Sequence, residues 1–288
     1  MIEVEPIAFD SMGTRSMATL VRTGDLTVLI DPGVSLAPIR YGLPPHPIEV
    51  ERMEEHHDAI VRAAREADVL VVTHYHYDHH MPDEPEIFEG KIALIKHPRE
   101  KINMSQRRRA AYFLGVLEGF PRQIEEADGR EFRFGQTRIR FSQPVYHGTN
   151  PRLGYVIEVC IEHGGDKFVF TSDVEGPSLE DQVGFILEEK PDLVFLDGPM
   201  TYMLGYRYSA KSLQASVENM IRMLEAGVQT LVVDHHFLRD LNYRKRIEAV
   251  YEVAREKGAK VITAAEFAGK PIEMLEAHRK DLYEASSP

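Results

Sequence analysis

The chain has 288 residues, of which 43% are apolar and 28% charged, and its formal net charge at pH 7 is −12. This composition is typical of a soluble globular protein with two ordinary domains or one large layered domain, and it excludes global intrinsic disorder. The excess of 46 acidic over 34 basic residues argues against a large nucleic-acid-binding surface.

The single cysteine, Cys160, excludes an internal disulfide framework, and its apolar surroundings predict a buried strand residue. The N-terminus lacks the basic start and apolar stretch of a signal peptide. No window approaches the roughly 18 uncharged apolar residues that span a bilayer. We therefore expect a cytoplasmic protein without a membrane segment.

Apolar runs of strand length alternate with amphipathic runs of helix length, and no long linker separates them. Two Gly-containing turns, at residues 22–25 and 163–166, lie between neighbouring runs and predict hairpins. The predicted strands are Ile7 to Phe9, Met17 to Val21, Thr27 to Ile30, Val69 to Thr73, Ile92 to Ile95, Arg138 to Phe141, Tyr155 to Ile161, Phe168 to Thr171, Leu193 to Leu196, Thr230 to Val233 and Lys260 to Thr263.

Helices are predicted in the amphipathic runs between these strands. Gly227 and Gly258 each follow one of them, as is typical of helix ends. Hairpins together with strand–helix alternation in both halves predict two mixed sheets packed together and covered by helices on the outside. The predicted helices are Val50 to Glu66, Arg99 to Glu118, Leu179 to Glu189, Ser209 to Ala226, Tyr243 to Lys257 and about Ile272 to Tyr283.

Histidine is concentrated in one place, because four of the 13 histidines lie between positions 74 and 80. They follow the apolar run Val69 to Thr73, so a buried strand leads into the motif His-x-His-x-Asp-His. In extended backbone, alternate side chains point to the same side, and His74 and His76 can therefore bind one ion together. Asp78 and His79 lie far enough along the chain to reach a second ion.

This motif after an apolar strand resembles the signature of the metallo-β-lactamase superfamily. The resemblance extends from about Ile7 to Thr263. Within the superfamily, residues 12–17 and 101–109 resemble a group of uncharacterised, mostly archaeal predicted metal-dependent hydrolases. The resemblance implies an α+β fold, a four-layer αββα sandwich of two mixed β-sheets flanked by helices. It also implies a single domain over residues 1–288 with the active site at the edge between the sheets.

The resemblance further implies three later ligands, each at a strand end. His147, Asp173 and one of the adjacent His235 and His236 occur in the expected order. We favour His235 of that pair, because it directly ends its strand. By analogy with the family, the first metal position comprises His74, His76 and His147, the second comprises Asp78, His79 and His235, and Asp173 bridges the two.

Neutral imidazoles suit zinc, and the more oxygen-rich second position also suits manganese or iron. We therefore expect two divalent metal ions, with zinc preferred. The resemblance then implies a dinuclear metal-dependent hydrolase in which a metal-bridging hydroxide attacks an ester-type bond. Asp78 is expected to act in catalysis as well as in metal binding. His80, His236 and Tyr146 are candidate proton donors to the leaving group, because each neighbours a ligand.

Acidic residues also end two other strands. Asp31 resembles the family's acidic residue that accepts a hydrogen bond from a ligand histidine or its loop, although Asp-Pro-Gly can equally form a simple turn. Asp197 is interpreted as a turn former. His56, His57 and His97 fit no ligand position and are expected to be surface or loop residues.

The densest basic cluster is Arg107 to Arg109, with Lys96, Arg99 and Lys101 upstream. Such a run is typical of a solvated helix face, but it can also bind substrate phosphates. On the latter possibility we favour a phosphodiester or small phosphorylated substrate, either a small molecule or a short oligonucleotide. Two other functions remain open at this point: an iron-dependent oxidoreductase on the same fold, and a non-enzymatic metal-binding module.

Overall fold

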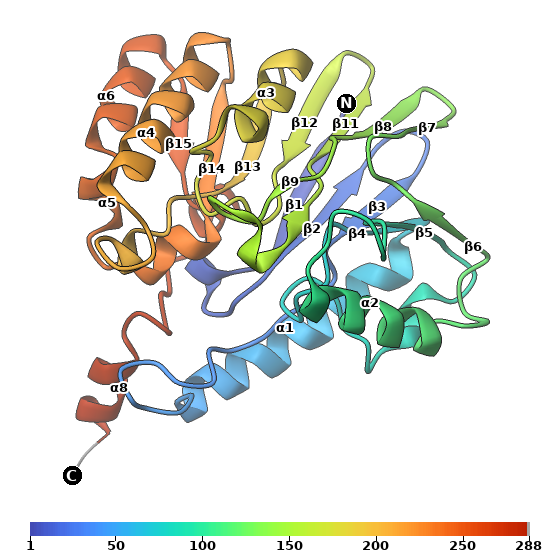
Figure 1. Ribbon diagram of the computed structural model, residues 1–288, viewed down its shortest axis with the longest axis horizontal. Helices are drawn as coiled ribbons and strands as arrows, with labels where there is room; N and C mark the ends of the chain where they lie inside the picture. Colours follow the sequence, from blue (N-terminus) through green and yellow to red (C-terminus); the bar gives the residue numbers. More distant parts are fainter. Residues whose placement is uncertain (287–288) are drawn as a thin grey trace.

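The computed structural model describes residues 1–286. Two mixed β-sheets pack against each other, and helices cover their outer faces (Figure 1). This is the predicted four-layer αββα arrangement. No helix within the described residues is long and apolar enough to cross a membrane.

The first sheet has six strands and comes from the first half of the chain. Its strands in spatial order are β1 (Glu3–Phe9), β2 (Met17–Arg22), β3 (Thr27–Ile30), β4 (Val69–Val72), β5 (Ile92–Ile95) and β6 (Gln123–Glu126). Its outer face is covered by α1 (Pro47–Glu66) and α2 (Met104–Val116).

The second sheet has seven strands. In spatial order they are β15 (Lys260–Ile262), β14 (Thr230–Asp234), β13 (Leu193–Asp197), β12 (Asp166–Phe170), β11 (Val159–His163), β8 (Thr137–Phe141) and β7 (Glu131–Phe134). A separate ribbon pairs β9 (Val145–Tyr146) with β10 (Tyr155–Val156). The remaining helices are α3 (Glu180–Glu189), α4 (Ala210–Glu225), α5 (Tyr243–Arg246), α6 (Glu248–Lys257), α7 (Ala264–Phe267) and α8 (Arg279–Ala285).

The apolar residues of β4 explain how the layers are held together. Val69 and Val71 face the core between the sheets, whereas Leu70 and Val72 face the core under α1 and α2. A strand buried on both faces needs an unbroken apolar run, which is the pattern that predicted it. Burying each such side chain stabilises the fold by roughly 1.5–3 kcal/mol.

Strand direction determines where the polar residues meet. Neighbouring strands from β3 to β6 run parallel, as do those from β12 to β15. Parallel strands bring their carboxyl ends to one edge, where functional side chains typically lie in open α/β sheets. The segments that follow β4, β12 and β14 therefore gather at one edge of the sandwich.

Three predicted helices differ from the observed ones. α2 begins at Met104, five residues later than predicted, because the Asn103 side chain accepts a hydrogen bond from the Gln106 N–H (2.8 Å) and caps the helix there. The predicted helix over 243–257 breaks into α5 and α6 at Ile247. The last helix begins only at Arg279, while the Glu273 N–H donates to the Ser11 carbonyl (2.7 Å) and ties that segment to the first sheet.

The predicted strand over 155–161 is also divided. Its first part, β10, pairs with β9, and its second part, β11, joins the second sheet. Three strands, β6, β7 and β9, were not predicted. β6 and β7 lie at sheet edges and are rich in charged residues, which is how natural sheets protect their edges.

Candidate metal centre

All seven predicted ligands follow the carboxyl end of a strand. The loop after β4 carries four of them, and one each follows β9, β12 and β14. Their side chains form two groups, within each of which the nearest ligand atoms lie no more than 4.8 Å apart. The first group is His74, His76, His147 and Asp173, and the second is Asp78, His79, Asp173 and His235.

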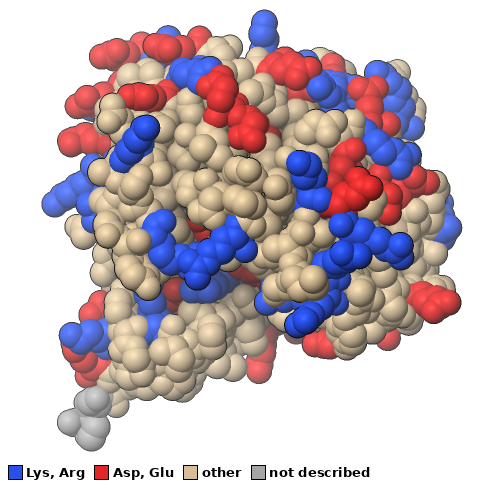
Figure 2. Space-filling view, in the orientation of Figure 1, with Lys and Arg blue, Asp and Glu red and all other residues tan. Residues whose placement is uncertain are grey.

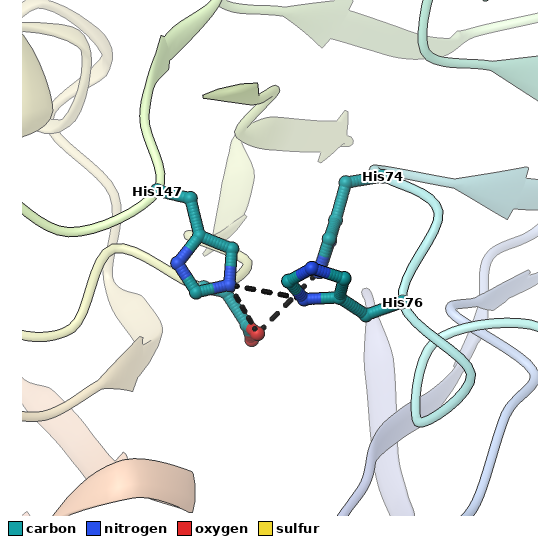
Figure 3. Close-up of side chains that lie close together, drawn as sticks. His74, His76 and His147 are labelled. Atoms are coloured by element: carbon teal, nitrogen blue, oxygen red, sulfur yellow. Dashed lines mark hydrogen bonds and ion pairs between the residues drawn. The ribbon is translucent and has the colours of Figure 1, made fainter. Parts of the chain in front are cut away.

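In the first group, the imidazoles of His74, His76 and His147 lie close together (Figure 3), and two of them contact one oxygen of Asp173. The Nε2 atom of His147 lies 3.2 Å from Nδ1 of His76 and 3.1 Å from Oδ2 of Asp173. The Nε2 atom of His74 lies 3.4 Å from the same oxygen. This arrangement presents three nitrogens and one oxygen to a common point.

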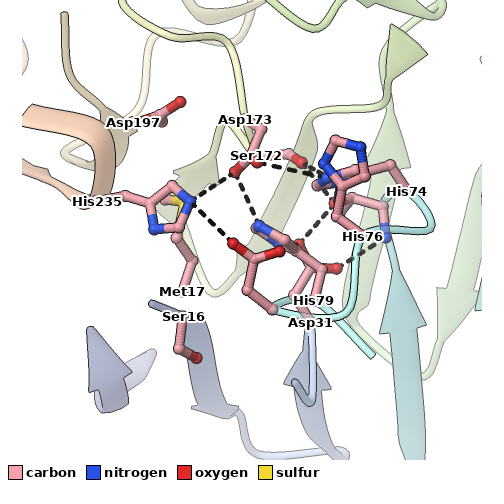
Figure 4. Close-up of polar contacts among 12 residues, drawn as sticks. Ser16, Met17, Asp31, His74, His76, His79, Ser172, Asp173, Asp197 and His235 are labelled. Carbon is pink, nitrogen blue, oxygen red and sulfur yellow. Dashed lines mark hydrogen bonds and ion pairs between the residues drawn. The ribbon is translucent and has the colours of Figure 1, made fainter. Parts of the chain in front are cut away.

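In the second group, the other oxygen of Asp173 takes the central place (Figure 4). Its Oδ1 atom lies 2.9 Å from Nε2 of His79 and 3.2 Å from Nε2 of His235. Asp78 is close by, with Oδ2 at 3.8 Å from Nε2 of His235. Asp173 therefore faces one group with each carboxylate oxygen, as a bridging ligand does.

The unpaired atoms of this centre fit metal ions. Nε2 of His74, Nε2 of His79 and Oδ1 of Asp173 are buried, and among residues 1–286 they make ion-pair contacts within this centre but no hydrogen bond of good geometry. Leaving a buried polar atom unpaired costs about 1–3 kcal/mol, so such atoms rarely gather without a ligand. Imidazole nitrogens and carboxylate oxygens are suitable donors for zinc, manganese or iron.

The two groups differ electrostatically. Burial lowers the pKa of His74 well below its usual value and that of His76 to about 3, which keeps both imidazoles neutral. Burial also opposes protonation of His79, but the charges of Asp173 and Asp31 outweigh it and raise the pKa of His79 to about 10. Against the same burial effect, Asp173 and Asp10 raise the pKa of His235 well above its usual value.

Comparison with known proteins identifies the family of the chain. A family model described as the metallo-beta-lactamase superfamily matches residues 13–235. The chain belongs to the metallo-β-lactamase superfamily. Among its relatives is a UPF0282 protein of Korarchaeum cryptofilum, 61% identical over 98% of this chain and 95% of the relative.

Solved structures with the superfamily fold align along most of the chain. An isothiocyanate hydrolase from Delia radicum gut bacteria aligns with a TM-score of 0.54 and 16% identity, covering 88% of this chain and 94% of its own. CmlA, a diiron β-hydroxylase from Streptomyces venezuelae, aligns with a TM-score of 0.53 and 12% identity, covering 90% of this chain and 52% of its own. At these identities the likeness shows the fold.

Behind the candidate ligands lies a layer of hydrogen-bonding residues. Asp31 lies where it was expected, with Oδ2 at 2.7 Å from Nδ1 of His79, and it also accepts hydrogen bonds from the backbone and hydroxyl of Thr73. A carboxylate in this place fixes the ring orientation and makes the imidazole a stronger donor to a metal. The Thr73 hydroxyl in turn lies 2.5 Å from that of Ser172, which is 3.2 Å from Nδ1 of His74. This chain of contacts joins the ends of β4 and β12.

Sequence reasoning missed a matching carboxylate. Asp10 directly follows β1, and its Oδ2 lies 2.7 Å from Nδ1 of His235. The buried Arg239 donates to its other oxygen at 2.7 Å. The signal that singled out Asp31, an acid directly after a strand, would have found Asp10 as well.

Asp197 corrects a prediction, because it is more than a turn former. It is fully buried and accepts hydrogen bonds from the backbone N–H groups of Glu175 (2.7 Å) and His236 (3.1 Å). Its Oδ2 also lies 3.0 Å from Nδ1 of His236. Nε2 of His236 then faces Oε1 of Glu175 at 4.0 Å, and Nδ1 of His147 lies 3.6 Å from that oxygen. His235 therefore lies in the second group, whereas His236 lies in a further cluster with Asp173 and Asp197, and Glu175 is a second residue that the sequence analysis missed.

Other predicted residues lie elsewhere. The structure does not bring His80 into either ligand group: its Nδ1 lies 2.8 Å from the His76 carbonyl, and its ring packs on Phe113. The Tyr146 ring packs against that of Tyr155, so its role as proton donor stays a prediction.

Two predicted surface residues are buried. His56 on α1 lies under the surface, with Nδ1 at 2.6 Å from the Thr14 hydroxyl. Lys96 is not part of an exposed basic cluster, because it is buried and paired with Asp128 at 2.6 Å. The sequence around His56 and Lys96 carries no local signal that distinguishes a buried polar residue from an exposed one.

The backbone around the centre is strained. Asp31, Ser172, Glu175 and His235 all have φ between 48° and 59°, in the left-handed region that most residues avoid. Such conformations cost about 1–3 kcal/mol each and typically occur at functional sites. Gly33 adds a close approach, since a Cβ atom there would overlap the backbone of His79 and His80. Only glycine allows the loop after β3 to pack so closely on the ligand loop.

Proposed function

We propose that this chain is a dinuclear metal-dependent hydrolase that cleaves an ester-type bond, with phosphodiesters as the preferred class. The observation that carries the proposal is the position of Asp173, whose two oxygens face two groups of buried and half-buried candidate ligands. Bound divalent ions would supply a water of lowered pKa and would stabilise negative charge on the attacked group. His74, His76 and His147 would hold one ion, and Asp78, His79 and His235 the other.

His236 is the chain's best-placed proton carrier in this proposal. Its Nδ1–H donates to Asp197, which leaves Nε2 directed toward the ligand side, where Glu175 and His147 lie. Burial lowers the pKa of His236 well below its usual value, so the ring is neutral at rest and would take up a proton at Nε2 only transiently in the proposed reaction. It would then return that proton to the departing oxygen.

The experiment is a substrate screen with defined metal content. The full chain is loaded with zinc, manganese or iron, its metal content is measured, and hydrolysis of phosphodiester, lactone, thioester and β-lactam reporters is followed. We expect two ions per chain and highest activity on the phosphodiester. Fastest turnover of another reporter would move the proposal to that bond type. Iron binding with oxygen uptake and no hydrolysis would show that the protein is an oxidoreductase instead of a hydrolase. Metal binding without any turnover would show that it is a metal-binding module.

The proton role of His236 has its own test. His236→Asn keeps a side chain that can donate to Asp197 but removes the titrating ring. We expect kcat to fall by about 10²-fold for an alkyl leaving group, which needs a proton, and much less for p-nitrophenolate, which does not. His278→Asn, at a half-exposed histidine on the surface, is the control. Equal losses for both leaving groups would assign His236 a structural role.

A further inference from the structure

A cavity of about 230 Å³ lies directly beside the metal centre. Its lining begins at His147 and Glu175 and continues outward to Asn150, Arg152, Tyr206 and Arg207. The lining therefore joins a ligand of the first group to two arginines from loops that are far apart in the sequence. A substrate whose scissile bond lies at the metal centre has its next chemical group within reach of this cavity.

The backbone of Arg152 is firmly held. The Asn103 side-chain amide donates to the Arg152 carbonyl at 2.9 Å, and the Arg152 N–H donates to Oδ1 of Asn150 at 3.0 Å. The next carbonyl, of Leu153, accepts from Nε2 of Gln106 at 2.6 Å. α2 thus positions the loop that carries Arg152, while the guanidinium remains free to turn toward a ligand.

The backbone of Arg207 is held in a comparable way. Its N–H donates to the Met203 carbonyl at 3.0 Å, and the Gly205 N–H donates to the Tyr208 carbonyl at 2.9 Å. Tyr208 is buried, and its hydroxyl lies 2.7 Å from that of Ser216 on α4. Because the backbone of Arg207 is already fixed, less conformational entropy is lost when its side chain binds a ligand.

Neither guanidinium is neutralised by a close partner. Within residues 1–286, no carboxylate lies within 4 Å of Arg152 or Arg207, whereas Arg15 and Arg239 on the other side of the centre are both ion-paired. Glu175 is the acidic residue of the cavity lining, and its Oε1 faces His147 and His236. The positive charge at the outer part of the cavity is therefore available to a ligand.

The charge of the surrounding face supports an anionic ligand. The protein carries a net charge of −12, which repels anions in general. Figure 2 nevertheless shows Lys and Arg side chains across the middle of this face and over α2, while many Asp and Glu side chains lie along its upper edge. A local positive region in an acidic protein directs an anion to one place.

We propose that Arg152 and Arg207 form a subsite for a phosphate group of the substrate that is separate from the scissile bond. The inference rests on the proposed function and narrows it: the substrate class is a phosphodiester with an additional terminal phosphate, such as a 5′-phosphorylated dinucleotide. Arginine suits this role because its planar fork binds phosphate with two hydrogen bonds. The subsite differs from the Arg107 to Arg109 run that the sequence suggested as a phosphate anchor.

The test compares dithymidine phosphate with and without a 5′-phosphate, using the metal-loaded full chain. We expect the 5′-phosphate to lower KM by at least tenfold. Arg152→Gln and Arg207→Gln should each raise KM for the phosphorylated compound by on the order of tenfold, the loss expected for a charge-assisted contact, with kcat changed less than twofold. Neither variant should change KM for the compound that lacks the 5′-phosphate. Arg107→Gln is the matched control, since Arg107 is exposed on α2 and lies outside the cavity lining.

A second readout does not depend on turnover. Calorimetry measures binding of the same pair with a methylphosphonate linkage, which carries no charge at the scissile position. Tighter binding of the 5′-phosphorylated analogue that is lost in both arginine variants supports the subsite even if no hydrolysis occurs, and in that case the proposed function fails alone. Hydrolysis with no advantage from the 5′-phosphate, or an advantage that survives both substitutions, overturns the subsite and leaves the hydrolase proposal standing.

Discussion

The two ligand groups share Asp173 but differ in what stands behind their histidines. In the second group, His79 and His235 each meet a carboxylate at 2.7 Å, from Asp31 and Asp10. In the first group, Nδ1 of His74 meets the hydroxyls of Ser172 at 3.2 Å and Thr73 at 3.4 Å, and Nδ1 of His147 lies 3.6 Å from Oε1 of Glu175, which is too far for a hydrogen bond.

This difference in backing residues adds to the difference in protonation. The carboxylates of Asp173 and, behind the ring, Asp31 favour the charged form of His79 and raise its pKa to about 10 even though burial opposes this. Without a carboxylate behind it, burial lowers the pKa of His76 to about 3. The first position therefore offers neutral nitrogens that are ready to bind a cation, whereas at the second position a cation must displace protons.

Loss of the shared carboxylate should affect both groups at once. We expect Asp173→Asn to lower kcat/KM by about 10³-fold or more and to reduce bound metal from two ions to one or none, because each group loses an oxygen ligand. Hydrolysis assays and elemental analysis of the purified variant measure this. Asp83→Asn, at an exposed loop position, should keep both ions and full activity. A variant at Asp173 that keeps two ions would contradict the bridging role.

Substitution of the residues behind the ligand histidines should affect metal binding differently at the two positions. Asp31→Asn and Asp10→Asn should each weaken metal binding at the second position by about 10- to 100-fold, the usual effect of removing a carboxylate behind a ligand histidine. Ser172→Ala should weaken the first position only a few-fold, since the hydroxyl contact is longer and uncharged. Stepwise metal titration followed by calorimetry distinguishes the two positions. Equal effects of all three substitutions would remove the contrast.

Acidification should also act on one position. In the metal-free protein His79 has a raised pKa of about 10 and is protonated at every pH below that value, so metal binding releases its proton. His235, whose pKa is also raised well above its usual value, must lose its proton too, so the affinity of the second position should fall by up to about 100-fold for each unit of pH between 8 and 6. His76, with a lowered pKa of about 3, is already neutral there, so the first position should change little. Titrations in buffers of different ionisation enthalpy report the protons released at each step.

The smallest change in metal binding is expected at Gly33, which packs against the loop that carries His79. Gly33→Ala places a Cβ atom against the backbone of His79 and His80, so the ligand loop must shift. We expect stability to fall by about 1–3 kcal/mol and second-position affinity to fall a few-fold. Gly115→Ala on α2, where a Cβ meets nothing within 4 Å, should be neutral or slightly stabilising. Thermal unfolding compares the two variants.

The ligand loop could be predicted because its signal is local. The run Val69 to Val72 and the following motif lie within a dozen residues, so strand burial and side-chain alternation alone place His74 and His76 together. His147 and Asp173 needed the family resemblance, because each is ordinary in its own surroundings and only the chain's return to the same edge makes it a candidate ligand.

What could not be predicted depends on contacts between distant segments. In the sequence Asp197 resembles a simple turn former, because its partner His236 follows a different strand, β14. Lys96 resembles part of an exposed basic cluster because its ion-pair partner, Asp128, lies far away in the sequence. For the same reason Arg152 and Arg207 gave no signal: both line the cavity beside His147 only because two distant loops fold next to each other.

The hydroxyl contact between Thr73 and Ser172 has a practical consequence. It ties the two sheets together at the metal edge through the protein's own groups, and the hydrogen bond from the Ser11 N–H to Asp234 does the same on the other side of the centre. Chelators should therefore strip the cations without unravelling the sandwich. The metal-free protein could then be loaded with zinc, manganese or iron separately, so that its affinities for the three metals are compared in the same fold.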